Sequence, residues 1–112
     1  MGGLRYTELP VQVPRPQVER RLAYTDHLML TVMDFGDGPQ AQPDPPHTHA
    51  HEQVTYVAAG EILFFLEGRS QHLVAGDVFT VPSGKPHSIQ LLTAHVRLID
   101  CFTPLREDFL AP

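Results

Sequence analysis

The sequence lacks several features that would assign it to other classes of protein. Cys101 is its only cysteine, which rules out an internal disulfide and fits a reducing compartment. No apolar run approaches the roughly 20 residues needed to cross a bilayer, and residues 1–16 have no signal-peptide core. There is also no cluster of basic residues, and the formal net charge is −5. We therefore expect a cytoplasmic protein with neither nucleic acid nor membrane as a partner.

Eleven prolines and eight glycines separate short apolar runs, which disfavours long helices. Short strands with turn residues between them indicate a sandwich or barrel. A chain of 112 residues forms a single domain. The predicted fold is therefore all-β, a closed antiparallel barrel. The expected strands are 19–25, 27–35, 51–58, 62–67, 71–74, 78–81, 87–92 and 96–102.

The two ends of the chain differ from this pattern. Residues 1–18 contain Pro10, Pro14 and Pro16 and are predicted to form an extended N-terminal arm, with an edge strand around 5–9. Residues 19–112 form the barrel domain. Such an arm commonly packs on a neighbouring subunit, which favours a homodimer, although a frayed terminus is equally common. Residues 105–110 are expected to form a short helical turn.

The segment 46–60 carries histidines at every second position, His47, His49 and His51, followed by Gln53. In extended backbone, side chains two residues apart project from the same face. His47, His49 and Gln53 can therefore converge on one point. A buried imidazole needs a partner, because a buried polar group without one costs about 1–3 kcal/mol. This spacing predicts a metal site.

A second segment, 76–87, has the pattern of a turn, a strand and a proline-rich loop that ends at His87. An imidazole from a strand far along the chain would complete a set of four ligands. Pro82 and Pro86 flank Gly84 and restrict the loop, so that the position of His87 is fixed before a metal binds.

These two segments resemble the paired motifs of the cupin superfamily, which are small jelly-roll β-barrels of the RmlC-like type. The first motif is matched by His47, His49, Gln53 and Gly60. The second motif is matched by the set Gly76, Pro82, Gly84 and His87. The resemblance implies that His47, His49, Gln53 and His87 bind a divalent transition metal (Ni, Zn, Mn or Fe).

The sequence departs from the motifs at three positions. Ala41 and Leu91 replace a glycine and an asparagine that are frequent there, and Gln53 stands where many cupins have glutamate. A neutral amide leaves the bound cation more Lewis-acidic than a carboxylate would. His51 has the parity of the ligands but is a spacer in the motif, so it either binds metal or substrate or lies at the rim. His27, His72 and His95 are expected to be solvated.

The strand 96–102 places Asp100 on the same face as Val96, Leu98 and Phe102. This is the more apolar face, so Asp100 is expected inside the barrel, where a carboxylate is paired, adjacent to metal, or tuned as an acid or base. The alternative is a surface Asp100 that caps a turn or pairs with an arginine, Arg97 or Arg106. Arg106 follows Pro104 and can fold back over the mouth as an anion clamp.

The tail 100–109 and the segment around His47 are similar to the small single-domain cupins of pectin and alginate breakdown. Those proteins convert 4,5-unsaturated uronate monosaccharides to their linear keto form. The resemblance implies that Asp100, Phe102 and Arg106 are catalytic and that the substrate is a small anionic sugar such as an unsaturated galacturonate.

Two other functions fit the same sequence. A three-histidine cupin site with iron supports dioxygenase chemistry, which requires oxygen uptake. A non-catalytic sugar or small-molecule sensor would bind its ligand without turnover. A metal-free barrel is the structural alternative.

Overall fold

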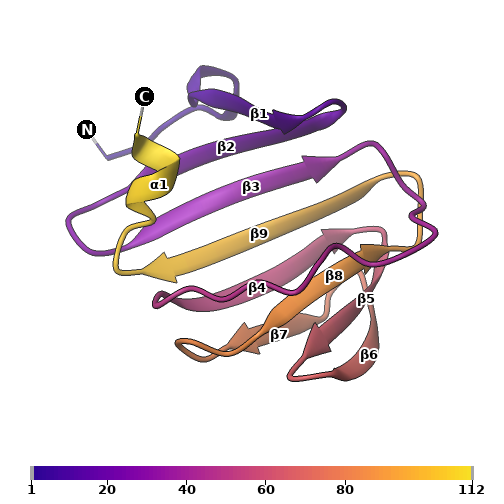
Figure 1. Ribbon diagram of the computed structural model, residues 1–112. Coiled ribbons are helices and arrows are strands. Elements are labelled where there is room, and N and C mark those ends of the chain that lie inside the picture. The colour runs from indigo at the N-terminus through magenta and orange to yellow at the C-terminus, as the bar shows by residue number, and fades with distance from the viewer. Residues whose placement is uncertain (1, 112) are drawn as a thin grey trace.

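The computed structural model describes residues 2–111, and its regular secondary structure is almost entirely β-strand, arranged in two antiparallel sheets (Figure 1). This confirms the predicted all-β jelly roll. The elements are η1 (Tyr6–Glu8), β1 (Val11–Arg15), β2 (Val18–Tyr24), β3 (Met29–Phe35), β4 (Glu52–Ala59), β5 (Glu61–Leu66), β6 (Arg69–Val74), β7 (Val78–Val81), β8 (His87–Leu91), β9 (Val96–Thr103) and α1 (Glu107–Leu110). Within the described part of the chain, no helix has the length and apolar character to cross a membrane.

The larger sheet has the strand order β1-β2-β3-β9-β4-β7, and the smaller has the order β6-β5-β8. The core lies between the sheets, where Phe64 of β5 stacks on Phe79 of β7 with ring centroids 4.1 Å apart. Alternation of apolar and polar residues directs one face of each strand into this core. Strand β9 lies between β3 and β4 and alternates strictly in burial, which places its even-numbered residues inside.

The N-terminal edge of the larger sheet differs from the sequence prediction. Residues 5–9 do not form the expected edge strand, because Tyr6–Glu8 is a 3-10 helix and the strand lies at Val11–Arg15. Pro14 is compatible with this strand because β1 is at the edge of the sheet, where one row of N–H groups has no partner strand. Thus the predicted arm contributes a strand to the sheet, while the boundary at residue 18 stays a prediction.

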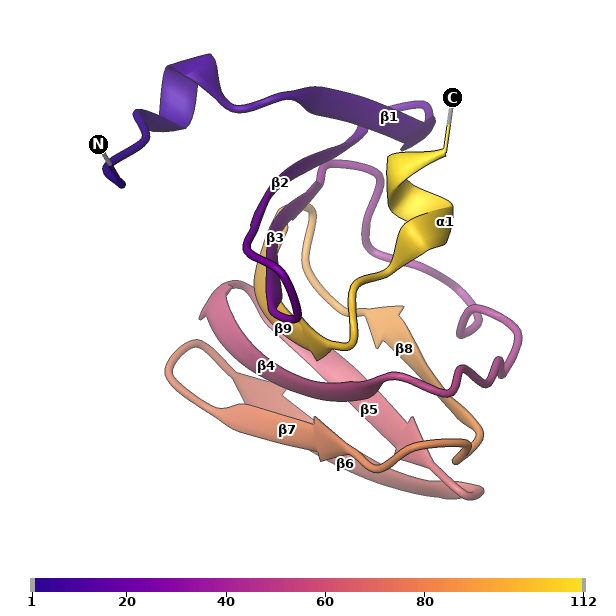
Figure 2. The ribbon, with the colours of Figure 1, turned by 90° about the vertical axis from the view of Figure 1, so that its left-hand side faces the viewer.

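The C-terminal turn α1 lies over the β1–β2 end of the larger sheet (Figure 2). It was expected within 105–110 and is found at Glu107–Leu110. The overhang of the larger sheet beyond the smaller one leaves room for this turn. In Figure 2 the described chain begins on one side of the molecule and ends, after α1, on the other.

The side of the larger sheet that faces away from the core is rich in apolar residues. Cross-strand neighbours on this side are Leu30, Cys101 and Val54 in one row and Val32, Ile99 and Tyr56 in the next. These residues, together with Val78, are called the outer apolar face below: Leu30, Val32, Val54, Tyr56, Val78, Ile99 and Cys101. Val54 and Val78 retain half of their accessible surface, with exposures of 50% and 52%.

Candidate metal centre and cavity

The loop before β4 brings the first histidine beside the last one. The backbone of residues 36–46 follows β8, where Gln40 and Asp44 donate to the carbonyl groups of Leu91 and Ile89. His47 and His87 then exchange two backbone hydrogen bonds of 3.0 Å, and their ring centroids lie 4.2 Å apart. The proline-rich loop thus contributes pairing that fixes the position of His47.

Backbone carbonyl groups orient two of the imidazoles. The Nδ1–H of His49 donates to the carbonyl of His51 over 2.9 Å, and that of His87 donates to the carbonyl of Lys85 over 2.8 Å. Each bond leaves the Nε2 lone pair available to a metal, which is the usual role of such outer contacts. Ligand atoms of His47, His49 and His87 all lie within 4.8 Å of one another.

A metal ion fits the polar groups at this point. The Nε2 atom of His87 is buried and has no hydrogen-bond partner, although buried polar side-chain atoms usually have one. The Nε2 atom of His49 lies 3.0 Å from the Oε1 atom of Gln53. Two atoms bound at right angles to one ion at about 2.1 Å would be about 3 Å apart. The three imidazoles therefore form a group that could hold a metal, with the Gln53 amide beside it.

The protonation of the imidazoles also suits a metal. Burial lowers the pKa of His47 and of His87, and the positive charge of the other histidines lowers both further. Both rings are therefore neutral near pH 7, and a neutral imidazole is the form that binds metal. Imidazole nitrogens suit zinc, iron and nickel.

The amide of Gln53 connects the imidazoles to a buried carboxylate. Its Nε2 donates to the hydroxyl of Thr55 over 2.9 Å and lies 3.4 Å from Oδ1 of Asp100. The Oε1 atom is consequently the one directed at His49. Because Gln53 is a neutral amide, the three imidazoles and the amide together bring no negative charge.

Asp100 is inside the barrel, as the face pattern predicted, with only 7% of its surface exposed. The hydroxyl groups of Thr55 and Thr31 donate to its two carboxylate oxygens over 2.6 and 3.1 Å. Both threonines are its cross-strand neighbours, on β4 and β3. Burial raises the pKa of Asp100, and the bonds from Thr55 and Thr31 offset part of that effect. The surface alternative is therefore wrong, because Asp100 has neither arginine as its hydrogen-bond partner.

A cavity of about 190 Å³ opens beside these groups. His47, His87, Gln53 and Asp100 line it. Aromatic, aliphatic and cationic groups also line it, among them Met33, Phe102, Arg106 and Phe109. The volume is below the roughly 300–1,000 Å³ of pockets for drug-sized ligands, which suits a small ligand.

Arg106 folds back over this cavity, as the sequence suggested. Its guanidinium group lies 5.1 Å from the ring centroid of Phe102 and 4.2 Å from that of Phe109. Two hydrogen bonds, of 3.0 and 2.8 Å, join it to the carboxylate of Asp108. These bonds lower the pKa of Asp108. An anion clamp at Arg106 stays a prediction, since an anionic ligand would compete with Asp108.

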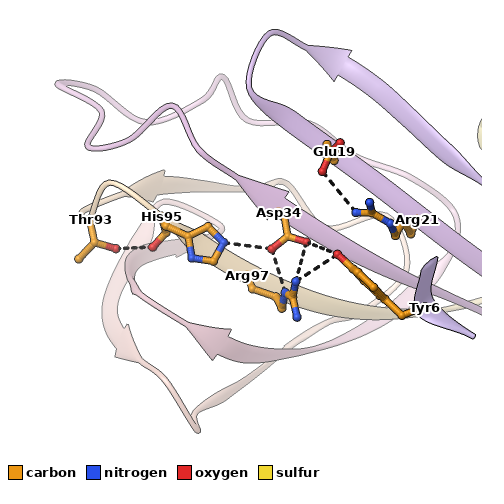
Figure 3. A network of polar contacts seen from close by, with 7 residues as sticks. All are labelled: Tyr6, Glu19, Arg21, Asp34, Thr93, His95 and Arg97. Atoms are coloured by element: carbon orange, nitrogen blue, oxygen red, sulfur yellow. Dashed lines mark hydrogen bonds and ion pairs between the residues drawn. The ribbon is translucent and has the colours of Figure 1, made fainter. Parts of the chain in front are cut away.

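The remaining polar side chains lie outside the three-imidazole group. His51 points to the C-terminal segment, where its Nε2–H donates to the carbonyl of Leu105 over 3.0 Å, so it occupies the rim. Arg97 pairs with Asp34 through two hydrogen bonds, and His95 donates to the same carboxylate (Figure 3). His27, His72 and His95 are exposed, as expected, although His72 also has a carboxylate neighbour in Glu61.

Sequence reasoning missed several residues around the cavity. Thr31 and Thr55 each lie two residues from a buried apolar residue on the same strand, so they share the inward face. This pattern could have placed them beside Asp100. Phe109, Arg20 and Gln12 carried no such pattern, because their contacts join segments about 90 residues apart along the chain.

Two antiparallel sheets with three imidazoles gathered at one end of the barrel define a jelly-roll protein with a candidate metal centre. Comparison with known proteins makes this specific. The chain belongs to the cupin family, because the model of the cupin domain matches residues 35–102.

Several relatives are similar over most of this chain. The pectin degradation protein KdgF of Dickeya dadantii is 34% identical over 90 residues, which are 80% of this chain and 79% of that protein. The structure of KdgF from Halomonas sp. matches with a TM-score of 0.83 and 32% identity, over 94% of this chain and 96% of that one. An RmlC-like cupin from Shewanella frigidimarina has a TM-score of 0.85 and 31% identity, with coverages of 97% and 96%.

A shorter match is to a regulatory protein. The HTH-type transcriptional regulator PuuR of Escherichia coli is 37% identical over 57 residues. These residues are 50% of this chain but only 31% of that regulator.

Proposed function

We propose that this chain is a metal-dependent enzyme that converts 4,5-unsaturated uronate monosaccharides, such as the galacturonate form, to linear keto-uronates. The observation that carries the proposal is a buried carboxylate, Asp100, 3.4 Å from the amide of Gln53, which lies next to the three imidazoles. The similarity to KdgF, a pectin degradation protein, supports a substrate derived from pectin. The small cavity favours a monosaccharide.

Each residue has a distinct role in this proposal. His47, His49, His87 and Gln53 hold the divalent cation (Ni, Zn, Mn or Fe), which supplies Lewis acidity at an enol or hemiacetal oxygen when it is bound. Asp100 accepts and returns a proton during ring opening and tautomerisation, a task that suits a carboxyl whose pKa burial has raised. Arg106 binds the substrate carboxylate, and Phe102 forms one wall of the cavity.

The experiment combines metal analysis of the purified protein with an activity assay. We expect about one divalent metal ion per chain and loss of the ultraviolet absorbance of 4,5-unsaturated galacturonate. A chelator should stop the reaction, and restored metal should restart it. Metal-loaded protein that leaves the absorbance unchanged would contradict the proposal, and oxygen uptake during turnover would favour an iron dioxygenase instead.

The match to PuuR supports a second candidate, a small-molecule-binding cupin without catalysis. In that case the same cavity binds an anionic sugar that is recovered unchanged. Calorimetric binding of the unsaturated uronate without product formation would distinguish this function from the enzymatic one.

We also propose that the protein is a cytoplasmic homodimer. Its single free cysteine, Cys101, suits a reducing compartment. The outer apolar face supports self-association, because exposed apolar patches of this kind commonly mark interfaces.

A further inference from the structure

The hairpin of β1 and β2 lies outside residues 35–102, the part that matches the cupin domain, yet it contacts Phe109, which lines the cavity. Gln12 of β1 is paired with Arg20 of β2, and Arg20 is paired with Met33 of β3. Residues opposite each other in antiparallel strands share a face. Since Met33 lines the cavity, Gln12 and Arg20 continue that inner face toward α1.

Two contacts join this hairpin to α1, and a third links the two hairpin residues that make them. The Nε2–H of Gln12 donates to the carbonyl of Phe109 over 2.6 Å, and the Nε–H of Arg20 donates to the Oε1 atom of Gln12 over 2.8 Å. The guanidinium carbon of Arg20 lies 3.7 Å from the ring centroid of Phe109. The hairpin thus holds both the backbone and the ring of a residue that walls the cavity.

Arg20 has no carboxylate partner that would explain its position. None of the ion pairs within residues 2–111 includes it. Burial lowers its pKa, and the charge of Arg106 lowers it further. Arg106 contacts the same Phe109 ring, at 4.2 Å. A half-buried cation without an ion pair is costly, and its contacts with Gln12 and Phe109 offset that cost together with the charges of Asp108 and Asp100.

We propose that Gln12 and Arg20 are positioning residues for the cavity, which hold Phe109, and through it Arg106, at the cavity wall. This inference deepens the proposed function and, for its kinetic part, rests on it. A four-residue turn such as α1 has little stability of its own, since helices this short are marginal in water. Its placement therefore depends on the hairpin.

The structural part of the test is hydrogen exchange of the amides of Phe109 and Ala111, which donate to the carbonyls of Arg106 and Glu107. We expect Arg20→Gln and Gln12→Leu each to accelerate this exchange several-fold in the metal-loaded protein. The control is Arg21→Gln. Arg21 adjoins Arg20 but contacts Glu19 and Tyr6, so its variant should exchange as wild type. Unchanged exchange in both Arg20→Gln and Gln12→Leu would overturn the proposal.

The kinetic part uses the unsaturated uronate. Arg20→Gln should raise KM by about 2- to 30-fold, the range expected for a lost cation–π contact, and leave kcat and metal content nearly unchanged. Arg20→Lys should recover only part of the loss, because an ammonium group cannot stack as a guanidinium does. A fall in kcat with constant KM would refute the positioning role. If wild type does not turn over the uronate, the proposed function fails, while the exchange result still decides whether the hairpin holds α1.

Discussion

At the scale of single residues, Asp100 is distinguished by the side chains that surround it. Its neighbours on β3 and β4 are threonines, which are short enough to fit the core and carry a hydroxyl directed at the carboxylate. Hydrocarbon side chains in these places would leave the buried carboxyl group with only the long 3.4 Å contact from Gln53, at a cost of several kcal/mol. The threonines therefore make it possible for a titratable group to lie within the core.

The variant Asp100→Asn tests the proton-transfer role. Asn has the same shape: its Oδ1 accepts from one threonine, and its amide N–H donates to the hydroxyl of the other, which turns to accept it. Metal content and folding should therefore be unchanged. Removing an acid–base group should lower kcat by about 10²- to 10⁴-fold. Asp77→Asn is a matched control, because Asp77 accepts a bond from the backbone of Val74 in a turn. Full activity of Asp100→Asn would show that this carboxyl transfers no proton.

The variant Gln53→Glu tests the neutral amide beside the metal centre. A carboxylate should hold a divalent cation more tightly and reduce its Lewis acidity. It would also place a negative charge next to Asp100 and raise the Asp100 pKa further, because like charges disfavour ionisation. We expect greater resistance to chelator, lower kcat, and onset of activity at higher pH. Gln71→Glu, on exposed β6, should change none of these.

At the scale of elements, the loop 36–46 is as important to the candidate metal centre as the strands. Gly38 is in contact with the strand β8 and the loop after it, so an added Cβ would overlap the carbonyl of Thr93 and meet the side chain of Leu91. No other residue fits there without displacing the loop, and displacement of the loop would move His47.

Gly38→Ala should therefore weaken metal binding by roughly 10- to 100-fold, the size of effect seen when the surroundings of a ligand change. Competition with a chromophoric chelator measures this. Gly76→Ala provides the control: it strains a turn with φ of +100° but meets open space. It should lower thermal stability without lowering metal affinity. Equal metal affinity in both variants would mean that the loop does not set the position of His47.

Much of the fold was predictable from the sequence, and the reasons lie in the strands. In strand β9, Asp100 shares the parity of Val96, Leu98 and Phe102, and this period of two predicted Asp100 inside the barrel. The alternate spacing of His47 and His49 likewise predicted that they converge, and the second motif added His87, the third imidazole of the group. The edge strand at Val11–Arg15 was misplaced, because an edge strand tolerates proline and has only one neighbour to impose a pattern. Contacts such as Gln12 with Phe109 have no local pattern at all.

At the scale of the whole molecule, the outer apolar face is notable because several of its apolar side chains are exposed to solvent in a single chain. Both of its rows are apolar across β3, β9 and β4, and the row that contains Tyr56 continues with Val78 on β7. A second copy offers the same flat, apolar surface, so two copies related by a two-fold axis would pack apolar rows against apolar rows. A stable interface of this kind buries about 800 Å² on each partner.

If the proposed homodimer forms through this face, Val54→Glu should convert it to a monomer, because a carboxylate at the centre of an apolar interface loses its water without gaining a partner. Light scattering coupled to gel filtration measures the mass, and metal content should be unchanged. Val13→Glu introduces the same change at an exposed residue of β1 and should leave the dimer intact. Wild-type protein that is monomeric at micromolar concentration would contradict this arrangement.

The pair of threonines beside Asp100 has one further consequence. A hydroxyl group both donates and accepts, and it switches between the two by turning about its C–O bond. Thr31 and Thr55 can thus accommodate Asp100 with or without its proton while every heavy atom stays in place. The barrel interior can therefore be rigid and still serve a carboxyl group that alternates between two charge states.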